Sequence, residues 1–175
     1  MAARRLLTFS IAAVAVLIGG GSWTRLSLHA QPVSALPPIE RLVVEKSARR
    51  ILAYGGGRVV YTIDHIQLGA APVGKKQFQG DEKTPEGDYT IDYGNLHSAY
   101  HLSLHISYPD AADKAYAARA GRSAGGDIFI HGQPNELPSG RPSGDWTDGC
   151  IAVSNEQIET LWLAVPDGTP VHIQP

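Results

Sequence analysis

The stretch that decides the fold class is "RLVVEKSARRILAYGGGRVVYTIDHIQLG" (Arg41–Gly69), in which apolar and polar residues alternate in short runs. Alternation with a period of two places successive side chains on opposite faces of a β-strand. It predicts strands at 41–46, 50–54 and 58–66, and Gly55–Gly57 predicts a hairpin turn between the last two. We therefore expect this part of the chain to form a β-sheet.

Further strands are predicted toward the C-terminus. Short apolar runs bounded by glycine, proline and serine indicate strands at 88–93, 100–108, 127–132 and 168–173. With the first three, the chain is expected to contain about seven or eight strands. Residues 41–175 are thus predicted to form one mainly β domain.

Two short helices are predicted from their capping residues. In "DAADKAYAARAG", Asp110 suits an N-cap and Gly121 suits the helix end. In "SNEQIETLWLAV", Ser154 is followed three residues later by Gln157, which is a capping-box pattern. The apolar residues that would then share one face of this helix are Ile158, Leu161, Trp162 and Val165.

The N-terminal residues 1–30 resemble a targeting segment. Arg4 and Arg5 precede the uncharged run "LLTFSIAAVAVLIGGG". A helix needs about 20 apolar residues to span a bilayer, so this shorter run favours a secretory signal peptide. Extending the uncharged run over 6–24 leaves an uncleaved membrane anchor as the alternative. In both cases we expect the domain to be exported to the periplasm or cell envelope, with "QPVSALPPIE" (31–40) as a proline-containing linker.

Charge and cysteine content narrow the function. The net charge of −2 over 175 residues gives no basic field for nucleic acid. The chain has one cysteine, Cys150. Cysteines of exported proteins usually occur in pairs, so this one is expected to be either a reactive thiol or a buried, inert residue.

The surroundings of Cys150 favour the reactive alternative. It lies in "DWTDGCIAVSN" shortly before a capped helix, and a helix N-terminus or a histidine lowers the pKa of a thiol. His131 ends the strand "DIFI" and precedes Gly132, where an imidazole can face a cleft. A general base must lie within hydrogen-bond reach of its nucleophile. Gly149 allows backbone amides to converge on an oxyanion. These residues predict a catalytic Cys–His pair.

Taken together, "IHG", a loop and "DWTDGCIAVSN" resemble the active-site signature of the L,D-transpeptidase catalytic domain, also called the YkuD-like domain. In that family a His-Gly pair is followed by Ser/Thr-x-Gly-Cys and a short apolar run. The segments "GDEKTPEGDYTI" and "HLSLHISYPD" also resemble the family, the latter the subgroup whose motif begins Asp-Trp-Thr. The resemblance covers about Leu42–Ile173. It implies a β-sandwich or barrel with two short helices.

The resemblance also implies roles for single residues. Cys150 would be the nucleophile and His131 its base, with the carbonyl of Gly132 orienting the imidazole. The amides of Gly149 and Cys150 would form the oxyanion hole. Many relatives carry a histidine directly before Gly-Cys, where this chain has Asp148. We expect that carboxylate to affect the choice of acceptor and to attract a cationic amine.

The neighbouring residues Asp145, Trp146 and Thr147 are expected to pack around the loop that presents the cysteine and to brace it. No metal or cofactor is required, because the thiolate supplies the nucleophile.

The implied reaction is a two-step acyl transfer on peptidoglycan stem peptides. The cysteine would attack the carbonyl of the third residue of a tetrapeptide donor, expel D-alanine and form a thioester. An amine acceptor on a second stem would give a cross-link, water would make the protein a carboxypeptidase, and a lysine of a lipoprotein would make it an anchoring enzyme. The alternatives are a thiol peptidase on the same substrate and a non-catalytic cell-wall binding module with a structural cysteine.

Three other groups of residues allow two interpretations each. His97, His101 and His105 recur every fourth residue, which indicates either zinc ligands or contacts to substrate at the rim. The absence of a metalloprotease glutamate favours the rim. The lysines of the loop before the fourth strand are predicted either to be solvated or to bind substrate carboxylates, with Lys83 as the candidate for binding. The same two interpretations apply to three arginines. These lysines and arginines are Lys75, Lys76, Lys83, Arg119, Arg122 and Arg141.

Overall fold

The structure is a computed structural model that describes residues 36–137 and 140–175. The predicted signal or anchor (1–30) and residues 31–35 of the predicted linker lie outside the described residues. Within the described ranges, no helix has the length and apolarity needed to cross a bilayer. The packed domain already includes Ile39, which is buried and whose amide donates to the carbonyl of Ala164 at 2.9 Å.

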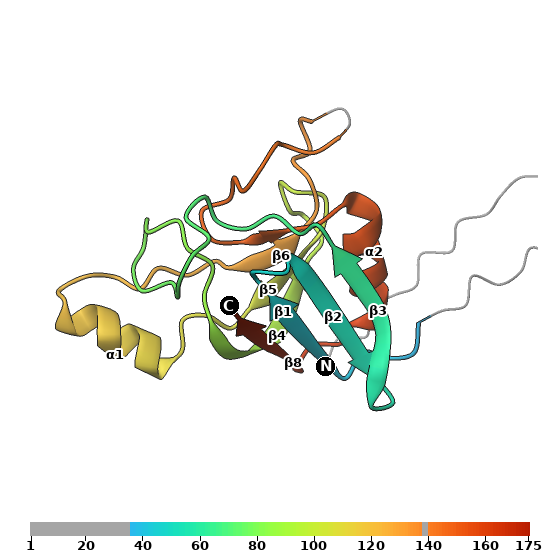
Figure 1. Cartoon of the computed structure of the whole chain (residues 1–175), viewed down its shortest axis with the longest axis horizontal. Coiled ribbons are helices and arrows are strands. Elements are labelled where there is room, and N and C mark those ends of the chain that lie inside the picture. Colours follow the sequence, from blue (N-terminus) through green and yellow to red (C-terminus); the bar gives the residue numbers. More distant parts are fainter. Residues whose placement is uncertain (1–35, 138–139) are drawn as a thin grey trace, which may run out of the picture. The chain divides into compact units, whose positions relative to one another are not determined.

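The described residues form a single eight-stranded sheet that curls around its core (Figure 1). Its strand order is β3-β2-β1-β8-β4-β5-β6-β7. The pairs β1–β8 and β6–β7 are parallel, and the other neighbours are antiparallel. The strands are β1 (Arg41–Glu45), β2 (Arg50–Gly55), β3 (Arg58–Asp64), β4 (Gly87–Asn95), β5 (Ser103–Ile106), β6 (Phe129–His131), β7 (Ile151–Ala152) and β8 (Thr169–Gln174). The predicted mainly β class is confirmed.

The sheet buries one face because its strands alternate as the sequence predicts. In β1, Leu42 and Val44 are buried, and in the parallel neighbour β8, Val171 and Ile173 are buried beside them. Removing such side chains from water contributes roughly 1.5–3 kcal/mol for each large one. The hydrophobic core is therefore continuous across the curled sheet.

Both predicted helices are present. Helix α1 (Ala111–Arg119) has Asp110 as its N-cap, and α2 (Asn155–Ala164) begins after the capping box of Ser154 and Gln157. Figure 1 shows α2 against the sheet and α1 standing to the other side. The expected face of α2 packs into the core, with Trp162 partly buried at its border. The buried residues of this face are Ile158, Leu161 and Val165.

Strand ends differ from prediction where the backbone turns. Strand β3 stops at Asp64 because His65 has φ 60°, and β5 starts only at Ser103 because His101 has φ 66°. Those values lie in the left-handed region, which a strand does not accommodate. The two-residue β7 was not predicted, because so short a run becomes a strand only by pairing with β6.

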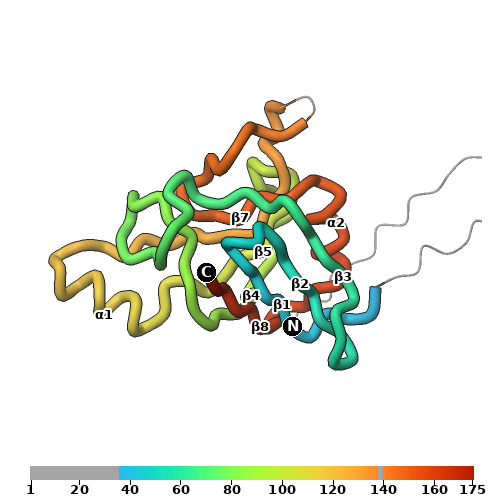
Figure 2. The backbone as a smooth tube through the Cα atoms, viewed as in Figure 1, coloured from blue at the N-terminus to red at the C-terminus, as the bar shows by residue number. Residues whose placement is uncertain are grey.

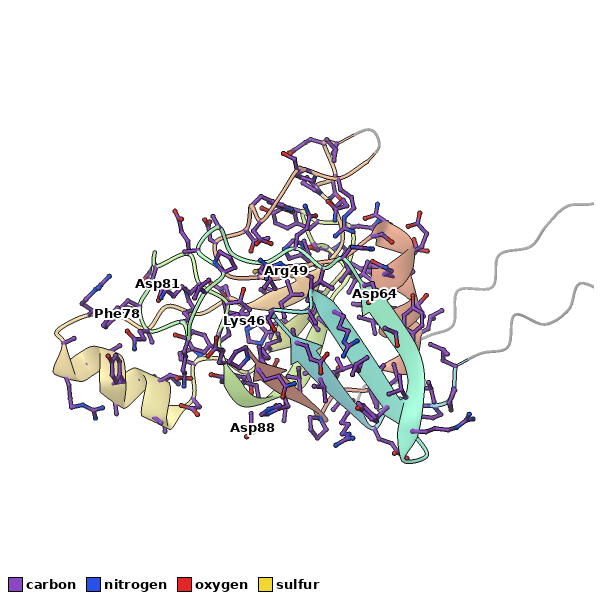
Figure 3. All side chains as sticks on the ribbon, in the orientation of Figure 1. Lys46, Arg49, Asp64, Phe78, Asp81 and Asp88 are labelled. Carbon is purple, nitrogen blue, oxygen red and sulfur yellow. The ribbon has the colours of Figure 1, made fainter. Side chains whose placement is uncertain are left out.

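The segment between β3 and β4 passes beside β7 (Figure 2). Gln67 forms a β-bridge with Ala152, and Gly69 forms one with Thr147. Figure 3 places Phe78 and Asp81 farther along this segment, on the side of α1. The segment thereby lies against the loop that leads into Cys150.

The prediction of a solvated loop is wrong for Lys76. Its side chain is 3% exposed, and its ammonium contacts Asp81 at 2.9 Å and donates to the carbonyl of Phe78 at 3.2 Å. Lys75 is exposed and pairs with Asp113 at 2.8 Å. Ion pairing, which the sequence does not reveal, therefore orders this loop.

Candidate active site

The pairing of β6 with β7 brings the two predicted catalytic residues together. Ile130 lies opposite Ile151, so Cys150, directly before β7, is placed beside Phe129. The amide of Phe129 donates to the Cys150 sulfur at 3.4 Å. His131 follows on the same side of the sheet, because residues two apart in a strand share a face. Cys150 and His131 consequently line the same cavity.

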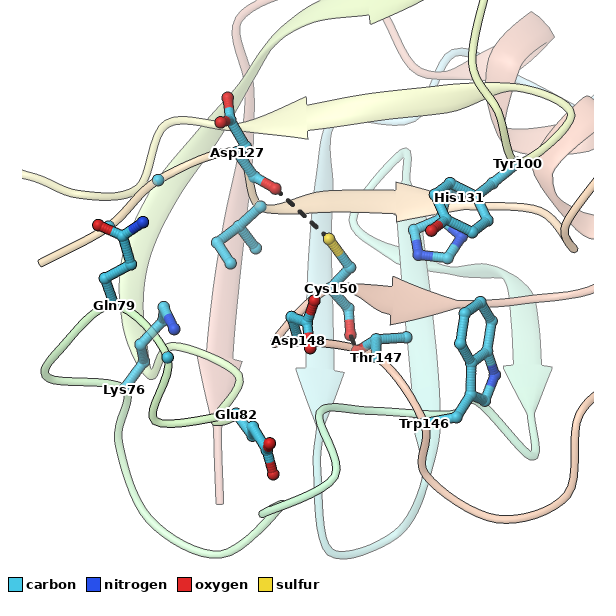
Figure 4. Close-up of a pocket in the computed structure, with 14 residues that line it drawn as sticks. Lys76, Gln79, Glu82, Tyr100, Asp127, His131, Trp146, Thr147, Asp148 and Cys150 are labelled. Atoms are coloured by element: carbon cyan, nitrogen blue, oxygen red, sulfur yellow. Dashed lines mark hydrogen bonds between the residues drawn. The ribbon is translucent and has the colours of Figure 1, made fainter.

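The His131 imidazole is held in one tautomer. Its Nδ1 lies 2.7 Å from the carbonyl of Gly132. A carbonyl only accepts, so Nδ1 carries the proton and Nε2 is left as a proton acceptor. The rings of Tyr100 and Trp146 lie 4.5 and 5.7 Å from the imidazole, and Figure 4 shows both beside it. Burial lowers the pKa of His131, against the opposing effect of the Gly132 hydrogen bond.

The pKa of the Cys150 thiol is raised, contrary to the expectation of a lowered pKa. Burial raises its pKa to about 11, and this outweighs the hydrogen bond from the Phe129 amide. The thiol donates to the carbonyl of Asp127 at 3.4 Å (Figure 4). Within the described residues, no hydrogen bond joins its sulfur to His131. The thiol is therefore held as a proton donor on the far side from its candidate base.

The loop before Cys150 is held by its own polar side chains. Asp145 accepts from the amide of Leu68 at 2.8 Å and pairs with Arg49. Thr147 Oγ1 donates to the carbonyl of Cys150 at 2.7 Å and accepts from the amide of Gly149 at 3.2 Å. The Gly149 amide, expected in the oxyanion hole, is thus already engaged within the loop.

Gly149 is required for the approach of this loop to the β3–β4 segment. Its φ is 128°, and a Cβ there would lie 2.5 Å from the carbonyl oxygen of Lys83. Lys83 thus contributes its backbone at this contact. Its side chain lines neither cavity at Cys150, and Lys76 is the lysine that reaches the cavity wall.

Two cavities share Cys150 as a wall residue. The larger has a volume of about 640 Å³ and the smaller about 280 Å³. Figure 4 shows Asp148, which is exposed, on the wall of the larger cavity. Both cavities include Tyr100, Asp127, His131 and Cys150. The larger also has Lys76, Gln79, Glu82, Trp146 and Thr147, and the smaller has Asn95, Ser98, Ser103 and Phe129.

Sequence reasoning missed Tyr100 and Asp127. Tyr100 lies on the turn before β5, far along the chain from His131, and only folding stacks the two rings. Asp127 acts through its main-chain carbonyl, so its residue type carries no signal for the contact with Cys150.

The three spaced histidines do not come together. His101 pairs with Glu159 at 2.7 Å and His105 with Asp92 at 2.6 Å. Neither they nor His97 line the cavities at Cys150. No group of three or more His, Cys, Asp or Glu side chains in the described ranges is arranged to hold a metal ion.

The predicted arginines also have structural partners. Arg122 lies 3.9 Å above the ring of Phe78, and Arg119 lies 5.7 Å above that of Tyr116. Arg141 donates to the side chain of Gln67 at 3.2 Å. None of the three arginines lines a cavity at Cys150.

Comparison with known proteins identifies one family. The sequence model of the L,D-transpeptidase catalytic domain, YkuD, matches residues 39–173. YafK of Escherichia coli (strain K12), which is named provisionally as an L,D-transpeptidase, is 31% identical over 95 residues. This match covers 53% of the chain and 32% of YafK, so the chain spans about a third of that relative.

Solved structures show the same fold. The helical cell shape determining protein Pgp2 from Campylobacter jejuni is 27% identical, with a TM-score of 0.62 over 79% of this chain and 48% of Pgp2. An L,D-transpeptidase from Xylanimonas cellulosilytica is 20% identical, with a TM-score of 0.51 over 79% of this chain and 61% of that one. The second likeness concerns the fold alone.

Proposed function

Because this chain belongs to the L,D-transpeptidase catalytic-domain (YkuD) family, we propose that it is a cysteine-dependent L,D-transpeptidase acting on peptidoglycan stem peptides. The observation that carries the proposal is the placement of Cys150 and His131 on the wall of one cavity, with the imidazole oriented by Gly132. A cavity of about 640 Å³ is in the usual range for a small-molecule site.

The first step is acylation of the thiol. When the donor enters, the Cys150 thiol leaves the Asp127 carbonyl and gives its proton to Nε2 of His131. The sulfur attacks the carbonyl carbon of the third stem residue, and the amide of Cys150 donates to the developing oxyanion. As the C–N bond breaks, the imidazolium returns the proton to the leaving amine of D-alanine. A thioester remains on Cys150.

The second step is aminolysis of that thioester. An amine of a second stem attacks the thioester carbon, and His131 takes the proton that the amine loses. The sulfur then leaves as the thiolate and regains this proton. Asp148 is on the cavity wall and exposed, where its carboxylate attracts an ammonium acceptor before deprotonation.

The proposed biological role is cross-linking of the cell wall after export. Export rests on the predicted signal or anchor in residues 1–30. The likeness to Pgp2, a helical cell shape determining protein, supports a contribution to cell shape. A lysine of a lipoprotein in place of the stem amine would make the same chemistry an anchoring reaction.

The test is incubation with purified disaccharide-tetrapeptide and analysis of the products by mass. Transfer predicts cross-linked dimers with release of D-alanine. Tripeptide without dimer would show that water is the acceptor and that the protein is a carboxypeptidase. Absence of both products would contradict the enzymatic proposal.

Matched variants assign the products to the site. Cys150→Ala and His131→Ala should each abolish them. His172→Ala is the control for a histidine on the same sheet, because His172 is exposed on β8 and pairs with Asp88. Equal loss in all three variants would argue against a role for the Cys150–His131 pair.

A further inference from the structure

An aromatic cluster lies in register with the nucleophile. Tyr93 of β4 is opposite His105 of β5, and His105 is opposite Phe129 of β6. Opposite residues in a sheet project on the same face. The amide of Phe129 in turn contacts the Cys150 sulfur. The outer face of β4, β5 and β6 therefore carries a row of rings that ends beside the catalytic cavity.

The three rings form one rigid surface, here named the aromatic cluster (Tyr93, His105 and Phe129). Tyr93 stacks on His105 with centroids 4.5 Å apart and planes inclined by 15°. Phe129 meets them edge to face at 4.8 and 6.0 Å. Asp92 holds the imidazole at 2.6 Å. Tyr93 nevertheless remains 44% exposed, so one part of its ring is open to a ligand.

The smaller cavity connects this cluster to the nucleophile. Phe129 and Cys150 both line it, together with the polar residues Asn95, Ser98 and Ser103 and the acidic residue Asp127. Polar residues beside aromatic rings suit a ligand with apolar C–H faces and many hydroxyl groups. A pyranose ring has that chemistry.

We propose that the aromatic cluster binds a sugar ring of the glycan to which the stem peptide is attached, an inference that rests on the proposed function. Three extended residues span at most about 10 Å. A donor with its third carbonyl at Cys150 therefore places its sugar close to the site, and the cluster begins at Phe129 beside the sulfur. Three rings are too small an area for a stable protein interface, which favours a sugar over a protein partner.

The test compares two donors, one tetrapeptide with the disaccharide and one without it. The wild-type protein should turn over the disaccharide donor with a higher kcat/KM. Tyr93→Ala should remove that advantage, about five- to tenfold for one aromatic contact, and leave the sugar-free donor unchanged. Tyr93→Phe should retain the advantage because it keeps the ring. Tyr116→Ala is the matched control, since Tyr116 is 43% exposed on α1.

The inference is overturned if the wild-type protein shows no preference for the disaccharide or if Tyr93→Ala keeps it. Failure of the proposed function looks different, because neither donor would be turned over. In that case, isothermal titration calorimetry with the peptide-free disaccharide decides the inference alone. Binding by the wild-type protein that Tyr93→Ala loses would support it, and no binding would refute it.

Discussion

At the scale of single residues, the proposed reaction begins from two neutral groups. Burial raises the pKa of Cys150 to about 11 and lowers the pKa of His131. A preformed thiolate–imidazolium pair is therefore disfavoured near neutral pH. A neutral imidazole is competent to accept a proton, so activation is expected to accompany substrate binding. The free thiol is thereby protected from unwanted nucleophilic reactions.

The pH dependence of alkylation tests this resting state. Because only the thiolate reacts, the rate of modification of Cys150 by iodoacetamide should still be rising above pH 9 and should reach half of its maximum near pH 11. The rate is measured by mass spectrometry, with free cysteine as the reference for the reagent. A plateau near neutral pH would show a preformed thiolate instead.

Gly149→Ala should disrupt the loop that leads into Cys150. The new Cβ would lie 2.5 Å from the Lys83 carbonyl, at a φ of 128°. We expect a loss of about 3 kcal/mol or more in the free energy of unfolding, measured with urea. Gly144→Ala is the matched control, because Gly144 has φ 68° but no atom near its Cβ position, and it should cost only about 1 kcal/mol. Equal losses of unfolding free energy in the two variants would mean that the positive φ, and not the contact with Lys83, causes the destabilisation.

At the scale of elements, α1 is fastened by one buried carboxylate. Asp113 is 5% exposed and completes the capping box with Asp110. It also accepts from the Tyr89 hydroxyl at 3.0 Å and pairs with Lys75 at 2.8 Å. Burial and this neighbouring carboxylate raise the pKa of Tyr89, which remains a hydrogen-bond donor at neutral pH. The Asp113 side chain thus joins the start of α1 to β4 and to the segment between β3 and β4.

Asp113→Ala should weaken the docking of α1. The buried Tyr89 hydroxyl would lose its partner and the capping box would open, at a cost of about 2 kcal/mol. Urea denaturation followed by circular dichroism measures this loss. Lys114→Ala, the exposed neighbour on the same helix, should change stability by less than about 0.5 kcal/mol. A similar effect of both changes would exclude a special role for the carboxylate.

At the scale of the whole domain, Lys46 ties the sheet to the wall of the larger cavity at Cys150. It follows β1 and its side chain is 3% exposed. Its ammonium contacts Glu86 at 2.7 Å and donates to the carbonyls of Gly74 and Thr84 at 2.8 and 3.1 Å. These acceptors lie on either side of the loop residues that line the larger cavity. The loop is thus closed at its base by one buried cation.

Lys46→Ala should destabilise the domain and loosen the loop at residues 74–84. Removing one partner leaves the partly buried Glu86 carboxylate and two carbonyls uncompensated, which should cost about 2 kcal/mol. Hydrogen exchange of residues 74–84 should rise along with the loss in unfolding free energy. The control is Arg50→Ala, which removes a more exposed pair with Glu45 and should cost less than about 1 kcal/mol. Unchanged hydrogen exchange at residues 74–84 in Lys46→Ala would contradict the inference that Lys46 holds this loop closed.

Local patterns in the sequence are sufficient to predict most elements and the two central site residues. The alternation in β1 and β2 and the caps at Asp110 and Ser154 depend on near neighbours, so the chain itself reveals them. His131 at a strand end and Cys150 after Gly149 belong to a short ordered motif, and that motif is specific enough to indicate the family.

Packing decides how these residues behave. The pKa of Cys150, the engagement of the Gly149 amide, the burial of Lys76 and the aromatic cluster around Tyr93 all depend on atoms far apart in the chain. Desolvation and cross-strand register are properties of the folded molecule and leave no periodic signal in the sequence. Local sequence patterns thus specify the β fold class and the Cys–His motif, whereas tertiary contacts set the pKa of the thiol, the backbone contacts and the surface beside Cys150.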